Sequence, residues 1–222
     1  ARLVRTRPDV DVRGLEIDPA RVATAEAQLA EVRAGRTPFP PDLPVSFARG
    51  GFEVPLPADR RPAVIRAMNV LRQYDEHDVP DAWGRMASRL SPAGLLIEGT
   101  CDEIGRIASW VDIDATAQPL RFTLSLRVAD LEHPSVVAER LPKALIHRNV
   151  AGERIHALLV DLDREWDRAA PLSTFGATQR FLAAVAALRA GGWPVLGDRH
   201  RWRLGELTLP WPAVAPRGFA WP

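Results

Sequence analysis

The chain contains very little cysteine and lysine for its length of 222 residues. Its single cysteine, Cys101, excludes an internal disulfide and is typical of a protein kept in a reducing compartment. Lys143 is the only lysine, so arginine supplies almost all of the positive charge. We interpret this skew as a GC-rich coding bias and not as a sign of phosphate recognition.

Neither sign of charge dominates, since 29 basic side chains stand against 28 acidic ones. This balance predicts no nucleic-acid partner, because such proteins carry a basic footprint. No apolar run reaches the roughly 18 residues of a membrane span, and the first residues lack the apolar core of a signal peptide. We therefore expect a cytoplasmic protein with no membrane partner and one sizeable core.

Motifs of several enzyme classes are also missing. The sequence has no Gly-x-Ser-x-Gly and no phosphate loop that ends in Gly-Lys. The spacing of its histidines and its cysteine does not match a zinc site, so we predict no metal. The residues considered for such a site are Cys101, His77, His133, His147, His156 and His200.

The most informative segment spans residues 10–21 and reads VDVRGLEIDPAR. Its apolar residues predict a short strand that is buried on both faces, namely Val10, Val12, Leu15 and Ile17. Asp18 and Pro19 then predict the start of a helix, as an N-cap followed by a proline at the first helical position.

Glu16 ends this strand directly before the capped helix. In a doubly wound nucleotide-binding fold, an acid at this place hydrogen-bonds the two ribose hydroxyls. The alternative is that Glu16 only ends a strand in solvent. This segment alone leaves both interpretations open.

Strands and helices alternate through the first half of the chain. Apolar runs and turn residues predict strands at 45–48, 63–71 and 95–98 and helices at 20–34 and 79–90. Such alternation favours an α/β fold with a doubly wound, mostly parallel sheet.

The second half has a different pattern. Alternating segments at 106–112 and 120–128 predict an antiparallel hairpin. Helices are expected at 135–148, with a kink at Pro142, and at 153–169 and 177–189, before a last strand at 202–209. We expect residues 1–130 to form a cofactor-binding core and residues 131–222 to pack on it as a substrate lid.

Four motifs in order resemble the class I S-adenosylmethionine-dependent methyltransferases. They are GLEIDP at 14–19, RGGF at 49–52, MNVLRQY at 68–74 and SPAGLLIEGT at 91–100. The resemblance covers about the first 100 to 130 residues, and the remainder has only a vague likeness to uncharacterised actinobacterial members of the family. It implies a Rossmann-like methyltransferase fold, methyl transfer and S-adenosyl-L-methionine as cofactor.

The resemblance also implies cofactor-binding residues. Glu16 would bind the ribose, and Ile17 would lie against the adenine. The turn Gly50, Gly51 and Phe52 would border the adenine edge, where the family commonly has an aspartate, so backbone atoms must substitute here. Asn69 and Val70 would lie near the methionine moiety.

The glycine-rich loop that follows the first strand of the family has no counterpart here. Residues 1–7 suggest the last turns of a helix, and a strand buried on both faces needs neighbours. We therefore expect the native protein to extend upstream of Ala1 by on the order of 25 residues. Expressed from Ala1, the chain should be poorly soluble and unable to hold the cofactor.

Two alternatives to a methyltransferase stay open. An NAD(P)-dependent oxidoreductase places a ribose-binding acid at the same position. No Lys, Tyr or His has a typical hydride-transfer spacing, however, and the turn before LLIEGT fits the methyltransferase pattern better. A non-catalytic scaffold with this fold is the second alternative.

Methyl transfer needs an in-line nucleophile and, for some acceptors, a base. Candidates for a catalytic role are His147, Tyr74 and Asp102, and the residues expected to bind substrate are Arg72, Tyr74, Asp102, Arg106 and His147. Lys143 and His147 share one helix face at i and i+4, although a solvated helix end explains that pair equally well. We expect a small-molecule acceptor that the sequence does not identify, and a homodimer is left open.

Overall fold

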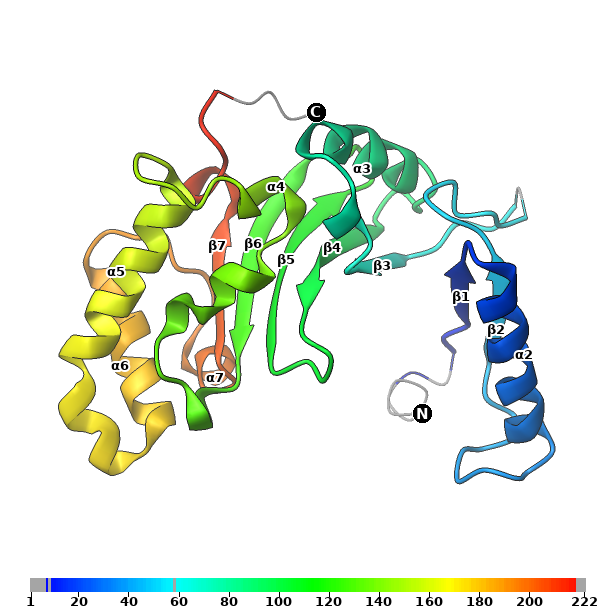
Figure 1. The fold of residues 1–222 in the computed structure, drawn as a ribbon, viewed down its shortest axis with the longest axis horizontal. Coiled ribbons are helices and arrows are strands. Elements are labelled where there is room, and N and C mark those ends of the chain that lie inside the picture. Colours follow the sequence, from blue (N-terminus) through cyan, green and yellow to red (C-terminus); the bar gives the residue numbers. More distant parts are fainter. Residues whose placement is uncertain (1–6, 8, 58, 219–222) are drawn as a thin grey trace. The chain divides into compact units, whose positions relative to one another are not determined.

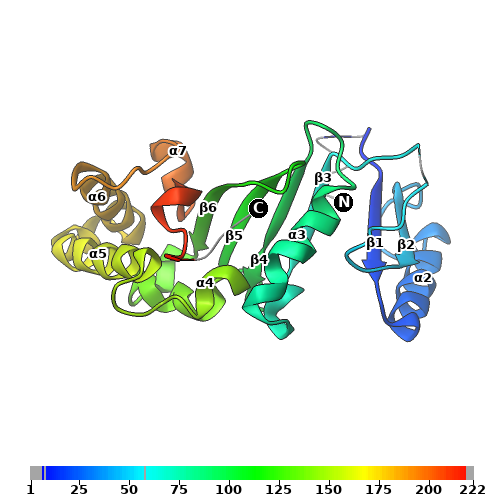
Figure 2. The same cartoon turned by 90° about the horizontal axis from the view of Figure 1, so that it is seen from above.

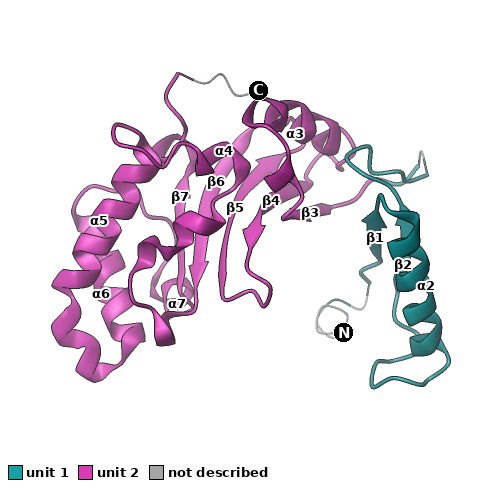
Figure 3. Ribbon diagram, viewed as in Figure 1, with its two compact units in different colours: residues 1–60 teal, residues 61–222 magenta. Residues whose placement is uncertain are grey.

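The computed structural model describes residues 7, 9–57 and 59–218. The chain divides into two compact units, residues 1–60 and residues 61–222 (Figure 3). Each unit has its own sheet, of two strands in the first and five in the second (Figure 1).

The first unit is a β-α-β element. It consists of β1 (Val12–Glu16), α2 (Pro19–Arg33) and β2 (Val45–Arg49), and the two strands are parallel. The predicted helix start is confirmed, because Asp18 Oδ1 accepts the Ala20 N–H at 2.8 Å with Pro19 in the first turn. Gly35 follows the helix with a φ of 70°, the left-handed conformation that glycine adopts readily after a helix end.

The prediction that β1 is buried on both faces is wrong for the described structure. Ile17 is 58% exposed, and the apolar residues Val10, Val12 and Leu15 are only half-buried. Within the described part of the chain, β1 pairs with β2 on one side, and α2 covers one face of this pair. One helix cannot cover both faces of a two-stranded sheet. The helix end expected at residues 1–7 falls almost entirely outside the described residues.

The second unit is built on a five-stranded mixed sheet. Its strands lie in chain order: β3 (Val64–Met68), β4 (Leu95–Cys101), β5 (Ile107–Asp114), β6 (Pro119–Leu126) and β7 (Glu206–Pro210). β3 and β4 are parallel, and the three following pairs are antiparallel. The α/β class and the hairpin of β5 and β6 are confirmed. Within the described residues, however, only β1–β2 and β3–β4 pair in parallel. The five-stranded sheet is therefore less parallel than we expected.

One face of this sheet holds the core. α3 (Val79–Ala87) and the 3-10 helix η4 (Pro134–Arg140) pack on it, and α5 (Arg154–Arg168) packs on η4 and on α6 (Ala177–Ala190) (Figure 2). The fully buried side chains here include Trp83, Leu96, Ile113, Phe122, Leu124 and Leu141. Alternate residues of the central strands therefore face an apolar layer.

Two predicted elements differ from the structure. The helix expected at 135–148 is divided at Pro142 into η4 and α4 (Lys143–Ile146), because Leu141 before the proline is extended, with φ −70° and ψ 145°. The strand expected at 202–209 begins later, since α7 (Arg199–Trp202) occupies its first position. The helices expected at 153–169 and 177–189 are confirmed.

The compact units do not coincide with the expected division at residue 130. Residues 131–222 add β7 to the same sheet as β6, and therefore belong to one unit with β3 to β6. The division into a cofactor-binding core and a substrate lid stays a prediction. No helix within the described residues has the length and apolar character that a membrane span needs. The remaining 3-10 helices are η1 (Leu71–Gln73), η2 (Glu76–Asp78), η3 (Val128–Asp130), η5 (Ala170–Phe175) and η6 (Trp211–Ala213).

Candidate functional site

A pocket of about 410 Å³ lies in the first unit, beside the ends of its two parallel strands. It is lined by Ile17, Arg49, Gly50, Glu53 and Pro55. Two of these, Ile17 and Gly50, are among the residues predicted to hold the cofactor. The carboxyl ends of parallel strands are the usual place for ligands in open α/β sheets.

Glu16 stands next to this pocket in a fixed orientation. Its Oε1 accepts the Asp18 N–H at 3.0 Å, and its Oε2 lies 3.7 Å from Arg21. The side chain is 37% exposed, so further lone pairs of the carboxylate stay accessible. The first turn of α2 therefore presents Glu16 as a hydrogen-bond acceptor.

The turn after β2 is joined to the end of β1. Gly50 donates its N–H to the Glu16 carbonyl at 3.0 Å, and Arg49 Nε donates to the Ile17 carbonyl at 3.3 Å. A Cβ atom on Gly50 would lie 2.5 Å from the Pro55 ring, so this position has no room for a side chain. The glycine is required for the close approach that shapes the pocket.

Glu53 is a pocket residue that the sequence did not reveal. Its Oε1 accepts the Gly51 N–H at 2.9 Å, and its side chain is exposed. The neighbouring Val54 is buried with a φ of 42°, a strained conformation for a β-branched residue. A carboxylate thus lines the pocket three residues after Gly50. Phe52 does not line the pocket.

In the second unit, Asn69 joins the ends of β3 and β4. Its Oδ1 accepts the Cys101 N–H at 2.9 Å, its Nδ2 lies 3.4 Å from the Cys101 sulfur, and its own N–H donates to the Gly99 carbonyl at 2.8 Å. Asn69 has a φ of 62°, a left-handed conformation that asparagine tolerates better than most residues. Its amide group is already hydrogen-bonded within the protein, while the following Val70 is 37% exposed.

The polar residues after β3 and β4 mostly stabilise turns and neighbouring segments. Arg72 donates to the Glu139 carbonyl at 3.0 Å, and Asp102 Oδ1 accepts the Arg106 N–H at 2.7 Å within the turn between β4 and β5. Tyr74 is half-buried beyond η1. The structure therefore gives Arg72 and Asp102 structural contacts, and their predicted roles toward a substrate stay predictions.

The predicted pair of Lys143 and His147 lies at α4 and its C-cap, and Arg148 and Asn149 follow directly. Lys143 Nζ and His147 Nε2 are 3.1 Å apart, as the i, i+4 spacing predicts. Arg148 instead binds Glu76 of η2, with Nε 2.8 Å from Oε1, and Glu153 at 3.5 Å. Asn149 Oδ1 is 3.1 Å from His156 Nδ1. The four residues thus divide into a paired Lys143 and His147 and two residues that brace the surrounding helices.

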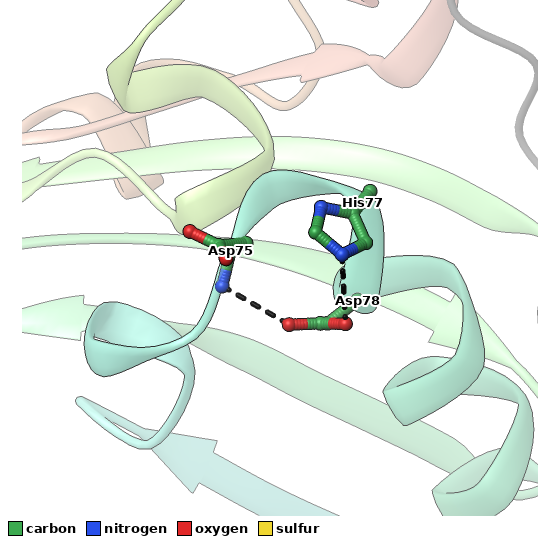
Figure 4. Close-up of side chains that lie close together, drawn as sticks. All are labelled: Asp75, His77 and Asp78. Carbon is green, nitrogen blue, oxygen red and sulfur yellow. Dashed lines mark hydrogen bonds and ion pairs between the residues drawn. The ribbon is translucent and has the colours of Figure 1, made fainter.

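A second polar cluster surrounds η2. Asp75, His77 and Asp78 bring one possible ligand atom each within 4.8 Å of one another (Figure 4). Both carboxylates form the reciprocal capping box of η2, in which the Asp75 N–H donates to Asp78 Oδ2 at 3.2 Å. Helix capping therefore accounts for this arrangement.

Glu98 is a buried acid in the middle of β4. It is 1% exposed, and the Trp83 indole N–H donates to its Oε2 at 3.4 Å. Burial raises the pKa of Glu98 to about 8, against the opposing effect of that hydrogen bond. The side chain is thus largely protonated at neutral pH, and it lies on the covered face of the sheet.

No family model matches the chain, and no curated protein matches it. Among solved structures, the PH0226 protein from Pyrococcus horikoshii OT3 is similar over 49% of this chain, with 11% identity and a TM-score of 0.33. The CcbJ methyltransferase from Streptomyces caelestis is similar over 51%, with 17% identity and a TM-score of 0.27. The chain spans 55% and 58% of the length of those two chains.

Proposed function

We propose that this chain belongs to an S-adenosylmethionine-dependent methyltransferase and that its first unit binds the adenosine part of the cofactor. The observation that carries the proposal is the pocket at the ends of β1 and β2, which Ile17 and Gly50 line and which Glu16 adjoins. The resemblance of the sequence motifs to methyltransferases assigns the same three residues to the adenosine.

The donor and acceptor chemistry of this pocket suits a nucleoside. The Glu16 carboxylate offers accessible lone pairs for a ribose diol, and the exposed Ile17 side chain offers an apolar surface for a base. A volume of about 410 Å³ lies within the usual range of small-molecule sites. The residues present therefore fit the adenosine group of the cofactor.

The turn of Gly50, Gly51 and Phe52 has no carboxylate of its own, and Glu53 supplies a hydrogen-bond acceptor for the adenine edge. We assign the exocyclic amino group of adenine to its carboxylate, which lines the pocket and is oriented by the Gly51 N–H. This assignment replaces the expectation that backbone atoms alone contact the adenine edge.

S-adenosylmethionine, when bound, supplies a methyl group on a positively charged sulfur. The task of the protein is then to orient the acceptor and exclude water. Tyr74 and His147 of the second unit are the residues that we propose to contact the acceptor. A small molecule is the acceptor class that we propose, since the near-neutral chain has no field to attract a polyanion.

An NAD(P)-dependent oxidoreductase is the second candidate. It is favoured by one observation only, the exposed carboxylate of Glu16 at the end of a strand that precedes a capped helix. It would bind NADH in place of S-adenosylhomocysteine, so one competition experiment separates the two.

Isothermal titration calorimetry on the native protein tests the proposal. We expect S-adenosylhomocysteine to bind and Glu16→Gln to weaken it by roughly ten- to a hundredfold, the loss of a charge-assisted hydrogen bond pair. Glu26→Gln is the matched control, because Glu26 is an exposed acid on the same helix, α2. Equal affinity of the wild type and the Glu16 variant would remove Glu16 from the site, and tight binding of NADH alone would support the oxidoreductase.

A further inference from the structure

The only lysine of the chain is hydrogen-bonded to a histidine. Lys143 Nζ and His147 Nε2 are 3.1 Å apart on α4. A protonated lysine has donors and no lone pair, so His147 Nε2 must accept this hydrogen bond and the ring hydrogen then belongs to Nδ1. The pair thus carries one positive charge and keeps free N–H donors on both side chains.

This positive charge has no acidic partner within the described residues. The ion pairs found there include none to Lys143, whereas the adjacent Arg148 is bound by both Glu76 and Glu153. Lys143 is half-buried and His147 is exposed. A half-buried ammonium that is not neutralised by the protein is well suited to an anionic ligand.

The segment that carries the pair is fixed at both ends. On its N-terminal side, Arg72 donates to the Glu139 carbonyl at 3.0 Å, and Ser109 Oγ donates to the Arg140 carbonyl at 2.6 Å. Thr100, one residue before the end of β4, donates to the Leu141 carbonyl at 3.3 Å. Beyond α4, Arg148 binds Glu76.

These contacts place Lys143 close to the edge at which β3 and β4 end. Arg72 follows β3, Thr100 is the next-to-last residue of β4, and Ser109 of β5 is paired with Thr100. All three residues that hold 139–141 therefore come from that edge. Parallel strands present their carboxyl ends to ligands. The pair is therefore held at the edge of the second unit where we expect a substrate.

We propose that Lys143, oriented by its hydrogen bond to His147, binds an oxyanion, a carboxylate or phosphate group, of the methyl acceptor. This inference rests on the proposed function and makes it more specific, because the acceptor becomes a small acidic molecule. Lysine acts as a compact point charge toward such groups, and the hydrogen bond to His147 Nε2 orients the Lys143 ammonium while its other N–H donors stay available. Both residues come from one fixed helical turn, so the ammonium is held in place before the ligand arrives.

Nuclear magnetic resonance tests the proposal without an identified substrate. Lysine labelled with 13C at Cε gives the Lys143 signal, which is assigned by its loss in Lys143→Arg. Inorganic phosphate and acetate are the two probes, and chloride at equal ionic strength is the control. We expect the Lys143 and His147 signals to shift with saturation for at least one oxyanion and not for chloride; the tighter of the two indicates a phosphorylated or a carboxylic acceptor.

Variants define which groups are responsible. Lys143→Gln and His147→Gln should each weaken the saturable binding by about tenfold, and Lys143→Arg should retain part of it. His77→Gln, which changes an exposed histidine outside the pair, should leave it unchanged. Shifts that rise linearly and equally with phosphate, acetate and chloride in the wild type overturn the inference, whether or not the variants fold.

Calorimetry with S-adenosylhomocysteine on the same sample separates this inference from the proposed function. Nucleoside binding without oxyanion binding at Lys143 removes the acidic acceptor and leaves the methyltransferase assignment intact. Oxyanion binding without nucleoside binding contradicts the methyltransferase and keeps the anion site.

Discussion

The side chain of Asn69 holds the end of β4 through Cys101. One end of its amide accepts the Cys101 N–H at 2.9 Å, and the other lies 3.4 Å from the Cys101 sulfur. Asn69 makes this double contact from a left-handed backbone conformation with a φ of 62°. The carboxyl ends of the two parallel strands β3 and β4 are thereby joined by a single side chain.

Two substitutions separate the contact from the conformation. Asn69→Ala loses the hydrogen bonds and also places a Cβ-bearing residue without a polar group in the left-handed region, so we expect a loss of about 1–3 kcal/mol in unfolding free energy. Asn69→Gly loses the same bonds but adopts this φ freely, and it should be less destabilised. Urea unfolding of both variants measures the difference; equal losses would mean that the backbone conformation contributes nothing.

The sequence predicted most of the local structure because the signals were local. Asp18 and Pro19 fixed the start of α2, and alternation around residues 115–118 identified the hairpin of β5 and β6. Pro142 was recognised as a disturbance of a helix, although it ends one helix and precedes another. Caps, turns and prolines act within a few residues, which is the range that a sequence pattern can report.

The remaining differences depend on contacts that are distant in sequence. Ile17 was expected to be buried because its neighbours are apolar, but burial depends on which elements cover β1. The sequence does not reveal Glu53 because the pocket that it lines also contains Ile17, which follows the distant strand β1. The hydrogen bond from Arg72 to a carbonyl 67 residues away is likewise invisible in the local sequence, while its predicted role toward a substrate stays a prediction. Periodicity contains no information about such partners.

Glu98 predicts an unusual dependence of stability on pH. Its pKa is about 8 in the folded protein, because of burial, against an ordinary value of 4.5. Between these values the folded state holds a proton that the unfolded state has released, so this residue lowers stability as pH rises, by at most about 1.4 kcal/mol per pH unit. Glu98→Gln cannot ionise and should lose this slope.

Unfolding free energies from pH 5 to pH 8 test this prediction. As pH rises, the unfolding free energy of the wild type should fall relative to that of Glu98→Gln. The unfolding free energy of Glu26→Gln, which changes an exposed acid, should follow that of the wild type. Parallel curves for the wild type and Glu98→Gln would show that the buried acid is ionised throughout this range.

The substitution Gly50→Ala should weaken nucleoside binding although it changes no charged group. In Gly50→Ala the new Cβ would lie 2.5 Å from the Pro55 ring, so the turn that shapes the pocket must move. We expect a clear drop in affinity for S-adenosylhomocysteine. Gly84→Ala is the control, because that glycine lies in α3 with nothing near a Cβ, and alanine there should raise stability by up to about 1 kcal/mol. Retained affinity in Gly50→Ala would place the nucleoside elsewhere.

The ion pairs of Arg148 with Glu76 and Glu153 should stabilise the protein around α4. Arg148 is 28% exposed and its partners Glu76 and Glu153 are 16% and 13% exposed, so water competes weakly for these groups. Removing the guanidinium in Arg148→Met takes the ion pair from two poorly hydrated carboxylates, although Glu153 keeps its hydrogen bond from the Arg217 N–H. We expect a loss of about 1–3 kcal/mol in unfolding free energy.

The matched control for Arg148 is Arg36→Met, which breaks an ion pair with Glu31 on the surface. Water solvates both groups there, so stability should hardly change. A second readout is the position of α4. When Arg148 no longer binds Glu76, α4 loses its attachment to η2, and the nuclear magnetic resonance signals of Lys143 and His147 should broaden or shift. If Arg148→Met and Arg36→Met are equally stable and the Lys143 signal is unchanged, the ion pairs of Arg148 do not position the pair, and the contacts of Arg72, Thr100 and Ser109 are sufficient to hold it.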